Sequence, residues 1–101
     1  MSKKIFLSGK ITDNPNYIEE FKMAEQYLKN EFKYYDIVNP CEPEGLSYRY
    51  YIDIGLTKLM HCEVICMLHN WQDSNGACLE HKYAETVGMR IIYLEDIAKK
   101  I

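Results

Sequence analysis

One acidic residue stands out because it lies within the apolar side of a predicted helix. The hydrophobic period predicts a helix over residues 74–88, in which Gly76, Ala77, Tyr83, Ala84 and Val87 share one side with Glu80, while His81, Lys82 and Glu85 lie on the other. Burial on such a side raises the pKa of a carboxyl group and suits a nucleophile or an acid–base group. The alternative is a structural glutamate that pairs with Lys10 or with a partner subunit.

The start of this helix carries groups that suit a ligand. Ser74, Asn75 and Gly76 present backbone N–H groups and the positive end of the helix dipole, which favour a phosphate or a carboxylate. The ring of Trp71, just before them, can stack on a nucleobase or cover a sugar. Both features have structural alternatives, since Asp73 or Ser74 can simply cap the helix and Trp71 can fill the edge of a sheet.

Strand and helix patterns alternate along the chain and must position these residues. Short apolar runs predict buried strands at residues 5–9, 34–39, 64–68 and 90–94. Amphipathic periods predict helices at residues 17–30, 49–61 and 74–88. Residues 41–46 are predicted as a loop, and residues 96–101 as a short helical turn or tail. This order predicts an α/β fold with a small doubly wound (Rossmann- or flavodoxin-like), four-stranded parallel sheet covered by helices on both faces. We expect residues 1–101 to form a single domain.

The predicted fold indicates where a ligand would bind. In doubly wound sheets, ligands bind beyond the carboxyl ends of the strands, near the point where the strand order reverses. We therefore expect three segments to converge, namely Ser8, Gly9 and Lys10 after the first strand, Asn39 after the second, and residues 70–76 after the third. The chain has neither a G-x-x-x-x-G-K-[ST] loop nor a G-x-G-x-x-G fingerprint, which argues against an ordinary nucleoside triphosphate or dinucleotide site.

Charge and composition disfavour several classes of partner. The 101-residue chain has a formal net charge of −3 and scattered basic residues, which argues against a nucleic-acid polymer or an anionic membrane. Without a signal-peptide pattern, a cytoplasmic protein is expected, whose Cys41, Cys62, Cys66 and Cys78 stay reduced and mostly buried. We expect no cofactor and no metal, because Cys66 and His69 would face opposite sides of a strand and could not join Cys62 around zinc.

Three segments together resemble the nucleoside 2-deoxyribosyltransferase-like family. They are residues 6–12 (F-L-S-G-K-I-T), residues 38–40 (V-N-P) and residues 68–81, which contain a G-A-x-x-E-H motif. The resemblance spans nearly the whole chain and is closest to a small uncharacterised branch common in bacteria and phages. It implies that Glu80 attacks the anomeric carbon of a nucleoside or nucleotide, and that water or an incoming base then resolves a covalent glycosyl–enzyme.

Two positions depart from the pattern of the characterised relatives. Phe6 stands where they have a tyrosine that orients the nucleophile, and Gly55 stands where they have the aspartate that protonates the leaving base. Asp53 is no substitute, since it lies about 200° away around the helix. Loss of a general acid typically costs about 10²–10⁴-fold in rate. Two functions therefore stay open, a deoxyribosyltransferase or nucleotide N-glycosidase that uses Glu80, and a module that binds a nucleotide as a sensor or sequestering protein.

We also expect the chain to form a homodimer or a higher homo-oligomer. Its nine tyrosines include Tyr48, Tyr50 and Tyr51, which surround Arg49, and such residues are typical of interfaces. The relatives complete their sites across a dimer. The alternative is that these rings cover the edge of the sheet. The expected partners are thus a small-molecule nucleoside or nucleotide and a second copy of the chain.

Overall fold

A computed structural model describes residues 3–41 and 48–98, with the backbone alone for residues 48–51. The side chains of Arg49 and its neighbouring tyrosines, and most of the predicted loop at 41–46, therefore lie outside the described residues. The elements in chain order are β1 (Lys3–Ser8), α1 (Tyr17–Glu31), β2 (Tyr35–Val38), α2 (Tyr48–Leu59), β3 (Val64–Met67), the 3-10 helix η1 (Trp71–Asp73), α3 (Asn75–Val87), β4 (Arg90–Tyr93) and α4 (Leu94–Ala98). The predicted order is confirmed, and η1 is the element that the sequence patterns missed.

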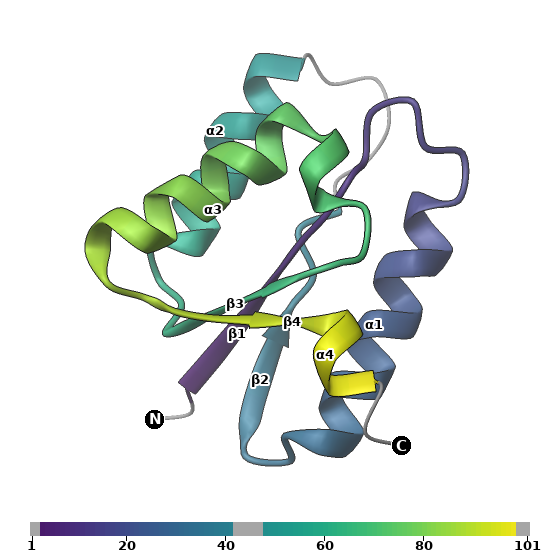
Figure 1. Ribbon diagram of the computed structural model, residues 1–101, viewed down its shortest axis with the longest axis vertical. Coiled ribbons are helices and arrows are strands. Elements are labelled where there is room, and N and C mark those ends of the chain that lie inside the picture. Colours follow the sequence, from purple (N-terminus) through teal and green to yellow (C-terminus); the bar gives the residue numbers. More distant parts are fainter. Residues whose placement is uncertain (1–2, 42–47, 99–101) are drawn as a thin grey trace.

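The four strands form one parallel sheet in the order β2-β1-β3-β4. The chain first crosses from β1 to β2 on one side and then returns to place β3 on the other side of β1 (Figure 1). The strand order thus reverses between β1 and β3. This topology confirms the predicted doubly wound α/β fold.

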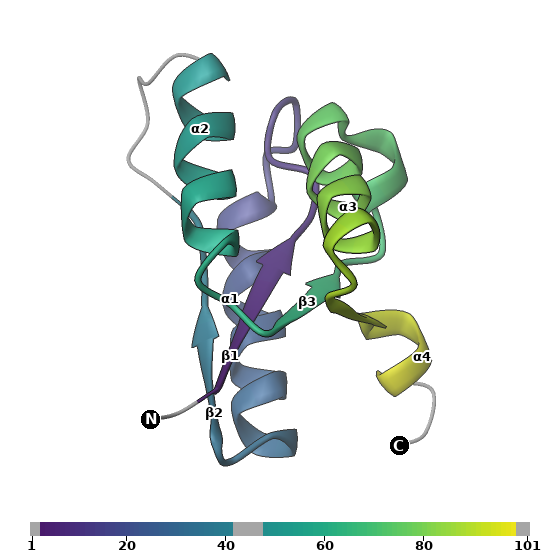
Figure 2. The same cartoon turned by 90° about the vertical axis from the view of Figure 1, so that its left-hand side faces the viewer.

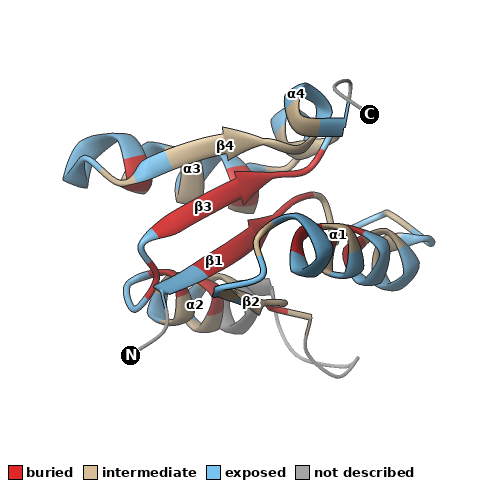
Figure 3. Ribbon diagram, turned by 90° about the horizontal axis from the view of Figure 1, so that it is seen from below, coloured by how far each residue is buried: buried red, intermediate tan, exposed pale blue. Residues whose placement is uncertain are grey.

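Helices cover both faces of the sheet because side chains alternate along each strand. Ile5 and Leu7 of β1 pack in the cluster that includes the buried side of α1, while Phe6 packs with residues of α2 and α3. Figure 3 shows β1 and β3 buried through most of their length, with exposed residues on the outer sides of the helices. The same alternation turns Ser8, the last residue of β1, toward α3. Among the described helices, none combines the length and the apolarity needed to cross a membrane.

The orientation of α3 differs from the prediction. Its buried side centres on Ala77 and Ala84, while Val87 is 54% exposed. His81, predicted on the opposite side, instead packs inward, with its side chain 14% exposed. The prediction was wrong on these two residues because it centred the face on Glu80, whereas the helix lies on the sheet through its alanines. Glu80 and His81 therefore flank the buried side, and Glu80 reaches toward α2 and β1.

All four cysteines are free thiols, but they are buried to different extents. Cys62 and Cys66 are buried, as predicted, and burial raises the pKa of their thiols to about 11 and about 12. Cys41 is partly buried, and Cys78 is exposed on α3. The prediction of mostly buried cysteines therefore holds for the two that pack around β3.

Candidate functional site

The loops after β1 and β3 lie side by side beyond the carboxyl ends of these strands (Figure 2). The backbone N–H of Lys10 donates a hydrogen bond to Oδ1 of Asn70 at 3.2 Å. Gly9 permits this close approach, because a Cβ atom at its position would lie 2.9 Å from Cβ of Leu68. The predicted convergence is thus confirmed for the first and third segments.

Glu20 on α1 connects both loops through hydrogen bonds with two asparagines. Asn14 donates from Nδ2 to the backbone oxygen of Lys10 at 2.9 Å and to Oε1 of Glu20 at 2.7 Å. Asn70 donates from Nδ2 to the same Glu20 oxygen at 3.3 Å. The sequence patterns gave no signal for Asn14 and Glu20 in this place, because the network joins side chains from three separate segments.

Two adjoining cavities open between these loops. The inner cavity has a volume of about 50 Å³ and is lined by Gly9, Ile11, Thr12, Ile52, Ser74, Gly76, Ala77 and Glu80. The outer cavity has a volume of about 340 Å³ and is lined by Lys10, Thr12, Asp13, Asp73, Ser74 and Asn75. Thr12 and Ser74 line both, so the cavities adjoin. Small-molecule sites usually measure about 300–1,000 Å³, so the outer cavity has room for a ligand while the inner one admits only a small group.

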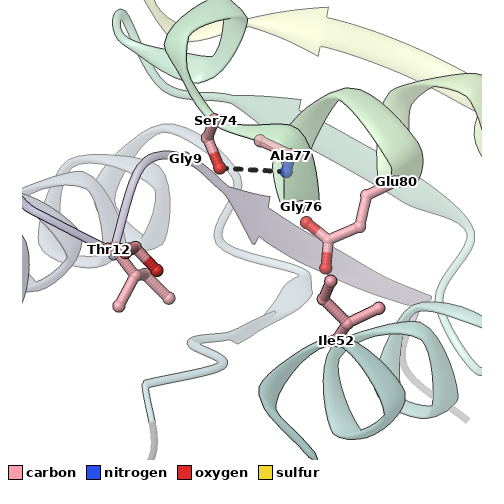
Figure 4. A pocket seen from close by; sticks show the side chains of 8 residues that line it. Gly9, Thr12, Ile52, Ser74, Gly76, Ala77 and Glu80 are labelled. Atoms are coloured by element: carbon pink, nitrogen blue, oxygen red, sulfur yellow. Dashed lines mark hydrogen bonds between the residues drawn. The ribbon is translucent and has the colours of Figure 1, made fainter. Parts of the chain in front are cut away.

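Glu80 points from α3 across the inner cavity toward Ile52 on α2 (Figure 4). Its Oε1 accepts a hydrogen bond of 2.6 Å from Oγ of Ser8, a residue only 1% exposed. Its Oε2 lies against the backbone of α2, since a Cβ atom on Gly55 would be 2.6 Å from that oxygen. The carboxyl group is therefore held between β1 and α2. Its described hydrogen-bond partner is Ser8, not Lys10 as the structural alternative supposed.

This environment raises the pKa of the Glu80 carboxyl group to about 7. Desolvation by burial is the larger cause, and the hydrogen bond from Ser8 opposes it by stabilising the charged form. The sequence-based prediction of a desolvated glutamate with a raised pKa is confirmed. Near neutral pH both the acid and the carboxylate are populated, so the group can lose or accept a proton there.

We expect this carboxyl group to make the protein less stable as the pH rises. Its folded-state pKa lies above the ordinary value of 4.5, so its contribution to stability is complete below pH 4.5 and is lost as the pH rises through about 7. The loss should be about 2 kcal/mol in the free energy of unfolding, allowing for partial exposure of the residue. Urea unfolding of the parent and of Glu80→Gln across this pH range measures it, and an equal pH dependence in both proteins would contradict the assignment.

Ser74 caps α3. Its Oγ accepts a hydrogen bond of 3.2 Å from the backbone N–H of Ala77, the geometry expected of an N-cap residue (Figure 4). The capping alternative for Ser74 is thus confirmed. Asn75 lines the outer cavity and Gly76 the inner one, at a helix start whose first N–H groups have no intrahelical acceptor. A ligand oxygen can still bind beside the cap.

Substitutions at Ser74 separate capping from ligand binding. Ser74→Ala removes the cap and should lower the free energy of unfolding by about 1 kcal/mol. Ser74→Asp and Ser74→Asn should keep the cap and the stability. If the helix start holds an anion, Ser74→Asp should weaken binding of 5′-monophosphates through charge repulsion, while Ser74→Asn retains it. Calorimetric titration with a nucleotide panel measures the effect, and equal affinity in both variants would assign Ser74 to capping alone.

Three predicted ligand contacts do not line these cavities. The first is Ser8, which is only 1% exposed and donates its hydrogen bond to Glu80. The other two lie away from the cavities. Asn39 follows β2 on the far side of β1, where its Nδ2 donates to Oε1 of Glu25 at 3.1 Å. Trp71 stacks on His81, with ring centroids 4.3 Å apart and planes 18° apart. Among the described residues that line the two cavities, neither is present. The packing of Trp71 matches its structural alternative, a ring that fills the edge of the sheet.

Five lining residues of the cavities were not among the predicted site residues. They are Ile11, Thr12 and Asp13 from the loop after β1, Ile52 from α2 and Ala77 from α3. Asp13 has a left-handed backbone with a φ of 58°, which short polar side chains tolerate. The position of the loop directly after the Gly9 turn was the signal that could have found three of them. Among the described residues, no group of three His, Cys, Asp or Glu side chains is placed to hold a metal ion.

Comparisons with known proteins agree with the fold. The family described as "Domain of unknown function (DUF4406)" matches residues 3–93. No curated protein matches the chain. A solved structure, the 2-desoxiribosyltransferase from Leishmania mexicana, is similar with a TM-score of 0.69 at 14% identity, covering 90% of this chain. The chain spans 63% of that neighbour's length. The likeness confirms a distant relationship of fold, and at this identity it concerns the fold alone.

Proposed function

The chain belongs to the DUF4406 family, and we propose that it binds a nucleoside or nucleotide and cleaves its N-glycosidic bond through Glu80. Cleavage would proceed by hydrolysis or by transfer of the deoxyribosyl group. The observation that carries the proposal is a desolvated carboxyl group beside a ligand-sized cavity, at the point where the strand order reverses. The activity named for the structural neighbour and the resemblance of the G-A-x-x-E-H segment support it.

The chemistry has two steps in this proposal. An oxygen of the Glu80 carboxylate attacks the anomeric carbon, the carbon–nitrogen bond breaks, and its electron pair leaves with the base, which takes a proton from solvent water. Water or a second base then attacks the same carbon, loses a proton to solvent, and breaks the bond between the carbon and the Glu80 oxygen, which releases the carboxylate. Two displacements retain the configuration of the sugar. The attacking form is the carboxylate, so the rate should increase with pH around the Glu80 pKa of about 7.

The outer cavity would hold the rest of the ligand. Lys10 supplies one positive charge, and the start of α3 adds the positive end of the helix dipole. Thr12 and Asp73 offer groups that can bind sugar hydroxyls. Because Thr12 and Ser74 also line the inner cavity, a ligand can extend from Glu80 to the outer surface.

The second candidate is a binding module that retains the pocket without turnover. The observation that favours it is Gly55, which brings no carboxylate to the position where the characterised relatives have their acid. An aspartate there would place its Cβ atom 2.6 Å from Oε2 of Glu80, so the present arrangement has room for one carboxyl group only. Water must then protonate the leaving base, which favours substrates with activated leaving groups.

Base release decides between the two candidates. We would incubate the parent and Glu80→Ala with a panel of nucleosides and 5′-monophosphates and detect the free base by mass spectrometry. Release by the parent that vanishes in Glu80→Ala is the expected result. Binding of a panel member without release would favour the binding module. If the parent protein neither binds nor cleaves any member of the panel, both candidate functions are contradicted.

We further propose that the chain acts as a homodimer or higher homo-oligomer in the cytoplasm and needs no cofactor. The tyrosine-rich start of α2 supports an interface. The small volume of the inner cavity, about 50 Å³, also suits a site that a second copy completes.

A further inference from the structure

We infer that Ser8 is the positioning residue of Glu80, so that its hydroxyl group takes the part that the tyrosine plays in the relatives. The inference rests on the proposed function, and it changes the role of Ser8 from a ligand contact to a partner of the carboxylate. Phe6, which replaces that tyrosine, is fully buried and lies two residues before Ser8 on the same side of β1.

The contact between the two residues is well defined. The distance of 2.6 Å from Oγ of Ser8 to Oε1 of Glu80 is typical of a hydroxyl that donates to a carboxylate. Ser8 is the one buried polar residue among the described positions. Burial of a hydroxyl group without a hydrogen-bond partner lowers the stability of a protein. Glu80 supplies this partner for Ser8, and Ser8 in turn supplies a donor for the carboxyl group of Glu80.

Among the described residues, Ser8 is the side chain that donates to Glu80, and the second carboxyl oxygen, Oε2, has no such donor there. Oε2 lies against the backbone of Gly55, where even a Cβ atom would be 2.6 Å away. Oε1 is thus held by Ser8, and Oε2 lies close to the backbone of α2. Ser8 therefore fixes the direction in which the carboxylate faces the inner cavity.

Among the described residues, no other charged side chain lines the inner cavity beside Glu80. Glu80 is the one titratable side chain among the described residues that line the inner cavity. The neighbours contributed by α2 and α3 are Ile52, Gly76 and Ala77, which have no polar side-chain group. The hydroxyl of Ser8 is thus the group that stabilises the anionic form, and the hydrogen bond lowers the pKa of Glu80 against the effect of burial.

The test compares Ser8→Ala with Ser8→Thr, which keeps the hydroxyl and suits a strand. Titration of the ¹³C-labelled Glu80 carboxyl group by NMR, assigned with Glu80→Gln, gives the midpoint. Loss of a hydrogen bond to a charged group should raise this midpoint by about one pH unit or more in Ser8→Ala, and Ser8→Thr should restore it. The midpoint of the pH–rate profile for base release should move in the same direction.

An unchanged midpoint in a folded Ser8→Ala protein would overturn the inference, even if the variant were less stable. Ser8→Cys, a near-isostere with a weaker donor, provides the measurement if Ser8→Ala fails to fold, and an unchanged midpoint there would count equally against it. The NMR titration needs no turnover. A parent protein that releases no base would therefore contradict the proposed enzyme, while the titration would still decide the role of Ser8.

Discussion

Glu80→Gln should lower the rate of base release by about 10³-fold or more, because removal of a catalytic nucleophile abolishes the covalent route. Glutamine has nearly the same size and keeps an oxygen that can accept from Ser8, so the fold and the cavities should remain. The affinity for an unreacted ligand should stay close to that of the parent. Single-turnover kinetics with the best panel substrate, together with calorimetric titration, separate chemistry from binding.

Glu85→Gln provides the matched control for this prediction. Glu85 lies on the same helix and is exposed, and its Oε1 is 3.5 Å from Nδ1 of His81. Its substitution makes the same chemical change on α3 without touching the described lining of the cavities, so the rate should be unchanged. Equal losses in both variants would assign the effect to charge or folding, and parental activity in Glu80→Gln would exclude Glu80 as the nucleophile.

Gly55→Ala should lower the rate of base release by about 10²-fold without lowering stability, because a misplacement of about 1 Å can cost that much. The added Cβ atom would be 2.6 Å from Oε2 of Glu80, and the free end of this side chain yields more readily than a helix backbone. Alanine also favours the helix by about 1 kcal/mol over glycine. The displaced carboxyl group should lose its aligned hydrogen bond to Ser8, which costs about 1 kcal/mol and offsets this gain in helix stability.

Thermal unfolding and base release, measured on the same preparations, check whether Gly55→Ala lowers the rate while the stability is kept. Thr57→Ala is the control, since Thr57 is exposed on α2 and alanine raises the helix propensity there without a contact to Glu80. It should leave the rate unchanged. Parental activity in Gly55→Ala would show that the carboxyl group tolerates displacement. A large loss of stability would instead mean that α2 itself moves.

Together, these variants ask whether one carboxyl group is sufficient at this site. Gly55 leaves no space for a second side chain beside Oε2 of Glu80, because a Cβ atom there would lie 2.6 Å from this oxygen. Activity that depends on both Glu80 and Gly55 would mean that one carboxyl group is sufficient when it is held in its present position. Binding that survives in all variants, without turnover in the parent, would favour the nucleotide-binding module.

The sequence by itself determined the local structure and one property of the site. Apolar runs and amphipathic periods placed the strands and helices in the correct order, because backbone conformation follows from the spacing of apolar side chains. The rule for doubly wound sheets then brought Gly9 and Ser74 together correctly. The desolvation of Glu80 was also predictable, since its neighbours along the helix are apolar.

Only the tertiary structure decided how the side chains of different elements meet. Ser8 and Glu80 are 72 residues apart, and their contact depends on the rotation of α3 on the sheet. That rotation centres on Ala77 and Ala84 because small residues allow the helix to approach the strands closely, and it turned His81 toward Trp71. The period of apolar residues predicts the rotation of a helix about its axis only to within tens of degrees. Hydrogen bonds and close contacts such as that at Gly55 require a much finer placement, which packing between elements supplies.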